Sequence, residues 1–276
     1  MKRINPFSRS FARKADTRSG FTLVELLVVI GIIALLISIL LPTIQSARRS
    51  GMSVRCQSNL RQIGSGFMMY ANEWHYALPP LTLNKYTNPV DRSVDGQRWY
   101  EYLGENRYLP DGHIGDPLNN RGYMTGVWRC PEVTDDETTI VGSFGFGGGY
   151  AVCGNTSTHV FRTLLVPGST VRQGGPRINR VKRPTDRWLI GDAGRYNGVM
   201  RNKWLPWAFM VPPNPDWLAQ ASGSGSEQAA GRHIGVRANV CFFDGHVESV
   251  AWKDLNVDYS GGNNRFFAPK KEVDQY

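Results

Sequence analysis

The sequence predicts an α+β fold in which one long N-terminal helix packs on a small antiparallel β-sheet. Three observations lead to this prediction. Residues 21–41 form an almost unbroken apolar run, residues 42–74 continue with apolar side chains at helical spacing, and an Asp-Gly pair at 244–245 joins two β-rich segments. One long helix covered on one side by a small sheet accounts for all three.

The apolar run is long enough to cross a membrane. It covers 21 residues, 21–41, and is interrupted by Thr22, Glu25, Gly31 and Ser38. As a helix it spans about 30 Å, the thickness of the hydrocarbon core of a bilayer. An acid costs about 3 kcal/mol at the centre of a membrane helix and less near its end. Glu25 therefore does not prevent insertion, but its charge needs a partner.

Basic residues before the run predict its orientation. Six Lys and Arg residues and a single acid, Asp16, precede it. Positively charged flanks stay in the cytoplasm, so we expect the N-terminus inside and the bulk of the chain outside, although four arginines between residues 48 and 61 weaken this asymmetry. A cleavable secretory signal has a shorter apolar segment, of about 7–15 residues, and a small-x-small site that residues 44–47 do not provide.

The junction SGFTLVELLVVI at residues 19–30 resembles the leader of type IV prepilins and type II secretion pseudopilins. The resemblance implies cleavage after Gly20 by a prepilin peptidase and N-methylation of the new terminus, Phe21. Glu25 then takes the position of the family's glutamate, the fifth of the mature chain. Separating this carboxylate from the Phe21 amine within a membrane is costly, so their pairing can set the register of subunits in a filament. A tolerated acid near the lipid headgroups is the alternative.

Further segments resemble a large pseudopilin-like group. CQSNLRQIG at residues 56–64 is similar to its Cys-x-x-Asn-Leu-x-Gln-Ile-Gly helix. His233 precedes the Asp-Gly pair as in the group's C-terminal His-x9-Asp-Gly motif, but here the interval holds ten residues. WRCPE at 128–132 and VKRPTDRWLIGDA at 181–193 are also similar to this group.

The expected organisation has four parts. They are a cytoplasmic leader at 1–20, a transmembrane helix half at 21–41, an amphipathic continuation at 42–74, and an extracytoplasmic pilin-like β domain with long loops at 75–276. One face of the continuation is apolar and is expected to pack on the sheet; it comprises Val54, Leu60, Ile63, Phe67, Met68 and Ala71.

The β domain is expected to contain a buried strand at residues 188–192 and a hairpin formed by residues 238–243 and 246–252. Asp244-Gly245 between them is typical of a type I′ turn, in which both central residues have positive φ. Residues 143–150 and 208–230 are rich in Gly, Pro or Ser, which predicts bends and loops.

Composition and motifs argue against an enzyme. The net charge is +9, but the first 20 residues carry +5 of it, so the processed chain lacks the charge typical of nucleic-acid binding. The sequence contains no phosphate-binding loop, no HExxH zinc motif and no serine nucleophile elbow. We therefore expect no catalytic residue and no cofactor.

Four polar residues, His233, Asp192, Asp244 and His246, stand out in the soluble part, and Gly245 lies between the last two in the turn. Two His and two Asp could hold zinc or another divalent metal. Their spacing matches no metal signature, so we assign no metal ligands and interpret Asp244-Gly245 as a turn. A calcium ion held by loop carboxylates and carbonyls is the alternative for this set.

Four cysteines allow a disulfide outside the cytoplasm. Cys130 and Cys153 are the pair considered, and closing their loop would contribute about 3 kcal/mol in the chain-entropy model. Cys56 and Cys241 can equally be small buried apolar residues.

These features favour a structural subunit of a type II secretion pseudopilus or a type IV pilus-like filament in the inner membrane. Its expected partners are other pilin-like subunits, the prepilin peptidase, the inner-membrane assembly platform and membrane lipids, without nucleic acid. The alternative is a single-pass anchored extracytoplasmic protein whose Trp-rich loops bind a carbohydrate or a peptide.

The first prediction concerns the mature terminus. Because the Ser19-Gly20-Phe21 junction precedes a membrane-length run, the mature chain is expected to begin at Phe21 and to carry a methylated amine. N-terminal mass spectrometry of the protein from membranes tests this. A chain that still begins at Met1, or that begins after Ala47, would contradict the prepilin interpretation.

Overall fold

The structure is a computed structural model of the 276-residue chain. It describes residues 21–79, 82–87, 94–105, 107–110, 113–116, 121–124, 126–133, 150–153, 177–197, 203–206, 209–210, 227–229 and 231–255. The chain divides into two compact units, residues 1–45 and residues 46–276. Helix α1 (Leu23–Glu73) contributes to both.

The described part of the first unit is the apolar half of α1. The helix continues through Pro42, so the missing N–H of this residue does not end it. The large apolar side chains between Phe21 and Ile44 are exposed, with 75% of Phe21 and 66% of Ile39 accessible. Among the described residues, α1 is the one helix long and apolar enough to span a membrane, by length and composition.

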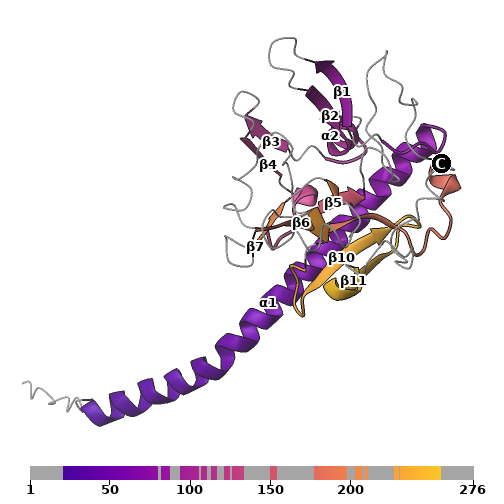
Figure 1. Ribbon diagram of the computed structural model, residues 1–276. Coiled ribbons are helices and arrows are strands. Elements are labelled where there is room, and N and C mark those ends of the chain that lie inside the picture. Colours follow the sequence, from indigo (N-terminus) through magenta and orange to yellow (C-terminus); the bar gives the residue numbers. More distant parts are fainter. Residues whose placement is uncertain are drawn as a thin grey trace, which may run out of the picture. The chain divides into compact units, whose positions relative to one another are not determined.

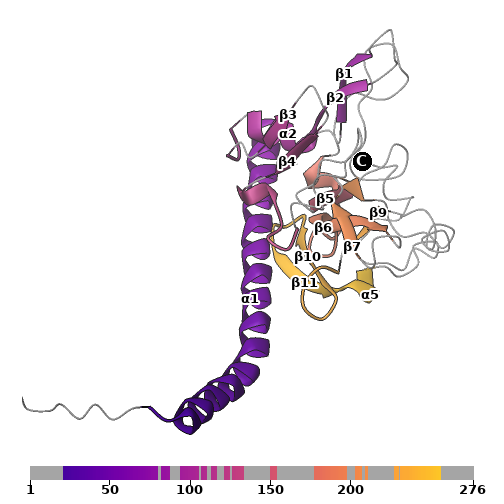
Figure 2. The same cartoon turned by 90° about the vertical axis from the view of Figure 1, so that its left-hand side faces the viewer.

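The second unit places the rest of α1 beside a mixed sheet, as both views show (Figures 1 and 2). The sheet has the strand order β11-β10-β6-β5-β8, with β7 and β9 also paired to β6. Two separate hairpins are formed by β1 with β2 and by β3 with β4. The strands are β1 (Thr82–Thr87), β2 (Val94–Arg98), β3 (His113–Asp116), β4 (Arg121–Met124), β5 (Tyr150–Cys153), β6 (Trp188–Asn197), β7 (Lys203–Pro206), β8 (Phe209–Met210), β9 (Glu227–Ala229), β10 (Arg237–Phe242) and β11 (Val247–Ala251).

Short helices complete the described chain. They are α2 (Trp99–Glu105), α5 (Trp252–Leu255) and the 3-10 turns η1 (Gly126–Trp128) and η2 (Ile178–Arg180). The predicted α+β architecture, a long N-terminal helix with an antiparallel sheet, is confirmed. The sheet differs from the expectation in one respect, because β5 and β8 pair in parallel. Residues 143–149 and most of 208–230, predicted as loops, lie outside the described residues.

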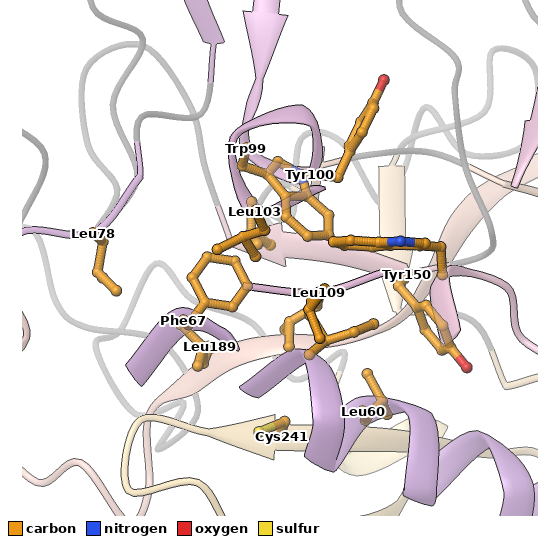
Figure 3. Packing of buried hydrophobic residues seen from close by; sticks show 14 of the residues in the cluster. Leu60, Phe67, Leu78, Trp99, Tyr100, Leu103, Leu109, Tyr150, Leu189 and Cys241 are labelled. Carbon is orange, nitrogen blue, oxygen red and sulfur yellow. The ribbon is translucent and has the colours of Figure 1, made fainter. Parts of the chain in front are cut away.

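The core forms where one face of α1 meets the sheet and α2 (Figure 3). Leu60, Ile63 and Phe67 are fully buried, and the Phe67 ring stacks on Trp99 of α2 with centroids 5.5 Å apart. The predicted apolar face is therefore correct over these turns. It is wrong at Val54, which is 64% exposed because the packed face begins at Cys56.

Two glycines of α1 allow this close packing. A Cβ on Gly64 would lie 2.6 Å from the Cys241 sulfur, and one on Gly66 would lie 2.9 Å from the side chain of Leu109. Both distances are too short for real Cβ atoms, so a larger residue at either position would force the side chain of Cys241 or Leu109 to shift.

The predicted hairpin is confirmed, but its predicted turn type is wrong. Strands β10 and β11 pair with Cys241 opposite Val247. Gly245 N–H donates to Phe242 O at 2.9 Å, and Phe242 N–H donates to His246 O at 2.9 Å. Gly245 has a φ of +89°, whereas Asp244 is not among the residues with positive φ. The loop is thus a three-residue turn closed by a glycine bulge, and Asp244 needs no left-handed backbone.

The second prediction follows from this turn. Gly245→Ala should destabilise the protein by about 1–2 kcal/mol, because an L-residue resists the left-handed backbone. Gly51→Ala is the matched control, since a Cβ meets nothing within 4 Å at either glycine and Gly51 lies in α1. The control should be neutral or stabilising by up to about 1 kcal/mol. Thermal melts of the full chain in detergent compare the two, and equal melting temperatures would contradict the turn assignment.

Candidate functional site: a buried polar cluster

The structure brings together two of the four polar residues singled out in the sequence. His233, just before β10, and Asp192 of β6 are both buried, and His233 Nε2 lies 2.8 Å from Asp192 Oδ2. Asp244 is instead exposed in the hairpin, where its Oδ1 accepts the N–H of His246 at 3.1 Å. Gly245 belongs to the same turn. The predicted set therefore separates into a buried pair and a surface turn.

Two cysteines complete the cluster around the buried pair. The Cys56 thiol of α1 donates to Asp192 Oδ1 at 3.3 Å, and the Cys130 sulfur lies 3.8 Å from His233 Nε2. One ligand-type atom from each of the four residues lies within 4.8 Å of the other three. All four residues are buried. We refer to Cys56, Cys130, Asp192 and His233 as the four-residue cluster.

Polar groups surround the four-residue cluster and fix its orientation. His233 Nδ1 lies 3.1 Å from Glu132 Oε1, so this imidazole lies between two carboxylates. The second oxygen of Glu132 is 3.9 Å from the Arg49 guanidinium. The N–H of Asn239 in β10 donates to Asp192 Oδ2 at 2.7 Å. Each carboxylate thus has partners on more than one side, as buried charges require.

Helix α1 holds its side of the site through two amides. The Asn59 side chain, one turn after Cys56, donates to Arg129 O at 3.0 Å and to the Tyr150 hydroxyl at 3.3 Å. The side chain of Gln57 donates to that of Asn239 at 3.3 Å. These bonds connect the helix to the η1 loop, to β5 and to β10.

Local backbone features explain how β6 and the turn before β10 place Asp192 and His233 in the cluster. A Cβ on Gly191 would lie 2.8 Å from Asn239 O, so glycine next to Asp192 lets β6 and β10 approach each other. His233 pairs with Arg237 across a tight turn in which Gly235 and Val236 have φ values of +76° and +54°. A β-branched residue with positive φ is strained, so surrounding contacts must hold this turn.

The electrostatics of the cluster favour a charged imidazole. Burial acts to lower the pKa of His233, but its hydrogen bonds with Asp192, Cys130 and Glu132 raise it to about 12. Burial acts to raise the pKa of Cys130, yet hydrogen bonds with Cys56 and His233 bring it below its ordinary value. The pKa of Cys56 is raised well above its ordinary value, first by burial and then by Cys130 and Asp192.

The predicted disulfide between Cys130 and Cys153 is not formed in the structure. Cys130 is a free, buried thiol, as are Cys56 and Cys241. Its sulfur lies 3.8 Å from His233 Nε2. The side chain of Cys153 lies outside the described residues. Cys241 is a small buried residue, which agrees with the alternative to a disulfide that the sequence analysis considered for Cys56 and Cys241.

A second, separate group of polar side chains marks the start of α1. The N–H and the hydroxyl of Thr22 donate to Glu25 Oε2 at 2.9 and 2.8 Å, and the N–H of Glu25 donates to the Thr22 hydroxyl at 3.3 Å. This reciprocal arrangement is a capping box. Gly20, the predicted cleavage site, lies outside the described residues.

Comparison with known proteins found one match, which covers the start of α1. Residues 16–41 match a family model described as the prokaryotic N-terminal methylation motif. The match supports a prepilin-type signal, which implies processing by a prepilin peptidase and assembly with other pilin subunits. Its described residues include one helix long and apolar enough to span a membrane, so the chain fits a single-pass membrane anchor. Comparison with curated proteins and with solved structures found no match.

Sequence reasoning found Asp192 and His233 but missed Cys56, Cys130 and Glu132 as their partners. All five lie in or beside segments singled out by their resemblance to one group, at 56–64, 128–132, 181–193 and 233–245. The sequence therefore contained a signal for this site, because four short segments that resemble the same group suggest that their polar residues meet at one place. Spacing along the sequence could not reveal it, since the partners are up to 177 residues apart between Cys56 and His233.

The third prediction concerns Asn59. Asn59→Ala removes the buried donor to the Arg129 carbonyl and to the Tyr150 hydroxyl, which should cost about 1–3 kcal/mol. Ser58→Ala is the control on the neighbouring, exposed helix position and should leave stability within about 0.5 kcal/mol of the wild type. Thermal melts of both variants test this. Equal melting temperatures for the two would show that the amide does not tie α1 to β5.

Proposed function

We propose that the chain is a pilin or pseudopilin subunit, cleaved after Gly20, methylated at Phe21 and anchored through residues 21–41. One observation carries the proposal. The N-terminal methylation motif coincides with the start of a membrane-length helix whose apolar side chains are exposed. An exposed apolar helix of this length needs a bilayer or neighbouring helices around it.

In this proposal the soluble unit faces the periplasm or cell exterior, and the subunit assembles with other pilin-like chains at an inner-membrane platform. The assembly is a type II secretion pseudopilus or a type IV pilus-like filament. Its work is mechanical rather than catalytic. The burial of the four-residue cluster supports this view, because these groups do not face a substrate in solvent.

Glu25 has two roles that experiments can separate. In the uncleaved chain it completes the capping box with Thr22. After cleavage, the new Phe21 amine lies close to the same carboxylate in sequence. Loss of a buried charge partner costs about 3–5 kcal/mol, whereas loss of a helix cap costs about 1 kcal/mol. Charge pairing between or within subunits should therefore dominate assembly.

The fourth prediction uses three variants. Glu25→Gln keeps a side chain suited to the capping box but removes the charge, Glu25→Val removes both, and Thr22→Ala removes the cap but keeps the charge. The two Glu25 variants should be inserted and cleaved, yet should enter filaments at least tenfold less than the wild type. Thr22→Ala should assemble at near wild-type level. Sheared filament fractions and N-terminal mass spectrometry measure assembly and cleavage.

The opposite pattern would identify the cap as the function of Glu25. In that case Thr22→Ala would fail to assemble while Glu25→Gln would behave as the wild type. A cleaved wild-type chain that stays monomeric beside its co-expressed membrane machinery would contradict the subunit proposal itself. It would favour the anchored binding protein instead.

A further inference from the structure

We propose that Cys56, Cys130, Asp192 and His233 form a structural zinc site that closes the core of the second unit. Two sulfurs, one imidazole nitrogen and one carboxylate oxygen are a donor set that zinc prefers. Calcium binds oxygen ligands, so the sulfur atoms make it a poor candidate for this cluster. The inference is independent of the filament function, because it concerns how the soluble unit is held together.

The distances between donor atoms agree with a tetrahedral ion. Zinc bond lengths of about 2.0 Å to nitrogen or oxygen and about 2.3 Å to sulfur place neighbouring donors about 3.3–3.8 Å apart. The Cys56 sulfur is 3.6 Å from Asp192 Oδ2, and the Cys130 sulfur is 3.8 Å from His233 Nε2. His233 Nε2 and Asp192 Oδ2 are 2.8 Å apart, so these two atoms would have to separate by about 0.5 Å.

Surrounding groups supply the outer shell that zinc sites require. A histidine that binds zinc commonly donates its other ring N–H to a carboxylate, which fixes the ring orientation. Glu132 Oε1 lies 3.1 Å from His233 Nδ1, which leaves Nε2 directed at the cluster. Asp192 is oriented in turn by the Asn239 N–H at 2.7 Å. Both outer partners are therefore in place.

The exchange of three protons for one zinc ion changes the net charge of the four ligands from zero (one imidazolium, two thiols, one carboxylate) to −1. Zinc would replace the proton at His233 Nε2 and the thiol protons of Cys56 and Cys130, and these protons go to solvent. The proton at Nδ1 stays on the imidazole, which donates it in the hydrogen bond to Glu132. Two thiolates and the Asp192 carboxylate then face one divalent ion and the neutral imidazole, with the Arg49 guanidinium 3.9 Å from Glu132.

The burial of the cluster indicates a structural site. All four ligands come from the protein and are buried, which leaves no open position for water or substrate. They belong to α1, the segment after η1, strand β6 and the turn before β10. One ion would thus link the membrane-anchored helix to three distant parts of the soluble fold.

The fifth prediction is the metal content of the full chain purified in detergent from zinc-containing medium. Elemental analysis should find close to one zinc ion per chain. Replacement by cobalt should give the visible absorption of a tetrahedral ion and a thiolate-to-cobalt charge-transfer band. Removal of zinc with a strong chelator should lower the Tm by several degrees, and added zinc should restore it.

Variants assign the ligands. Cys130→Ser and Asp192→Asn should lower zinc content at least fivefold, whereas Cys241→Ser, a buried cysteine outside the cluster, should retain it. If a ligand variant does not fold, the cobalt spectrum of the wild type decides alone. A wild-type chain without zinc, a cobalt complex without thiolate bands, or a Cys56–Cys130 disulfide in the purified protein would each overturn the proposal.

Discussion

The carboxylate of Asp192 is the group on which the second unit depends most. It accepts hydrogen bonds from the Cys56 thiol of α1 and the Asn239 N–H of β10, and it lies 2.8 Å from the imidazole of His233. A buried acid without partners is strongly unfavourable, so helix, sheet and turn must come together in one arrangement to satisfy it. Apolar packing of Leu60 and Phe67 supplies the burial, and Asp192 fixes the register.

The sequence was informative wherever a local pattern has a single structural solution. The apolar run and the spacing of Leu60, Ile63 and Phe67 predicted α1, and an Asp-Gly pair between two β-rich segments predicted the β10–β11 hairpin. The turn type was missed because Asp-Gly suits several hairpin loops, and only strand register decides between them. The parallel pairing of β8 with β5 depends on long-range topology, which no local pattern encodes.

In the four-residue cluster, too, the local sequence predicted some residues, whereas their partners depend on the long-range fold. Asp192 and His233 were selected for their chemistry, but the sequence pattern grouped them with Asp244 of the C-terminal Asp-Gly pair. The fold instead exposes Asp244 in the turn and brings in Cys56 and Cys130. At the start of α1, Glu25 was interpreted through its charge, while its hydrogen bonds with Thr22 were missed. Thr-x-x-Glu before an apolar run is a recognised signature of a helix N-terminus, so the sequence already indicated this capping box.

The wide sequence separation of these contacts has a consequence for how the chain matures. Helix α1 meets Asp192 across 136 residues and Asn239 across 182, so its packing face cannot be covered until most of the chain has been synthesised. Chains with such distant contacts fold slowly and expose apolar surface meanwhile. The helix is thus synthesised first and the strands that cover it last, which creates an interval in which a chaperone would protect the growing chain.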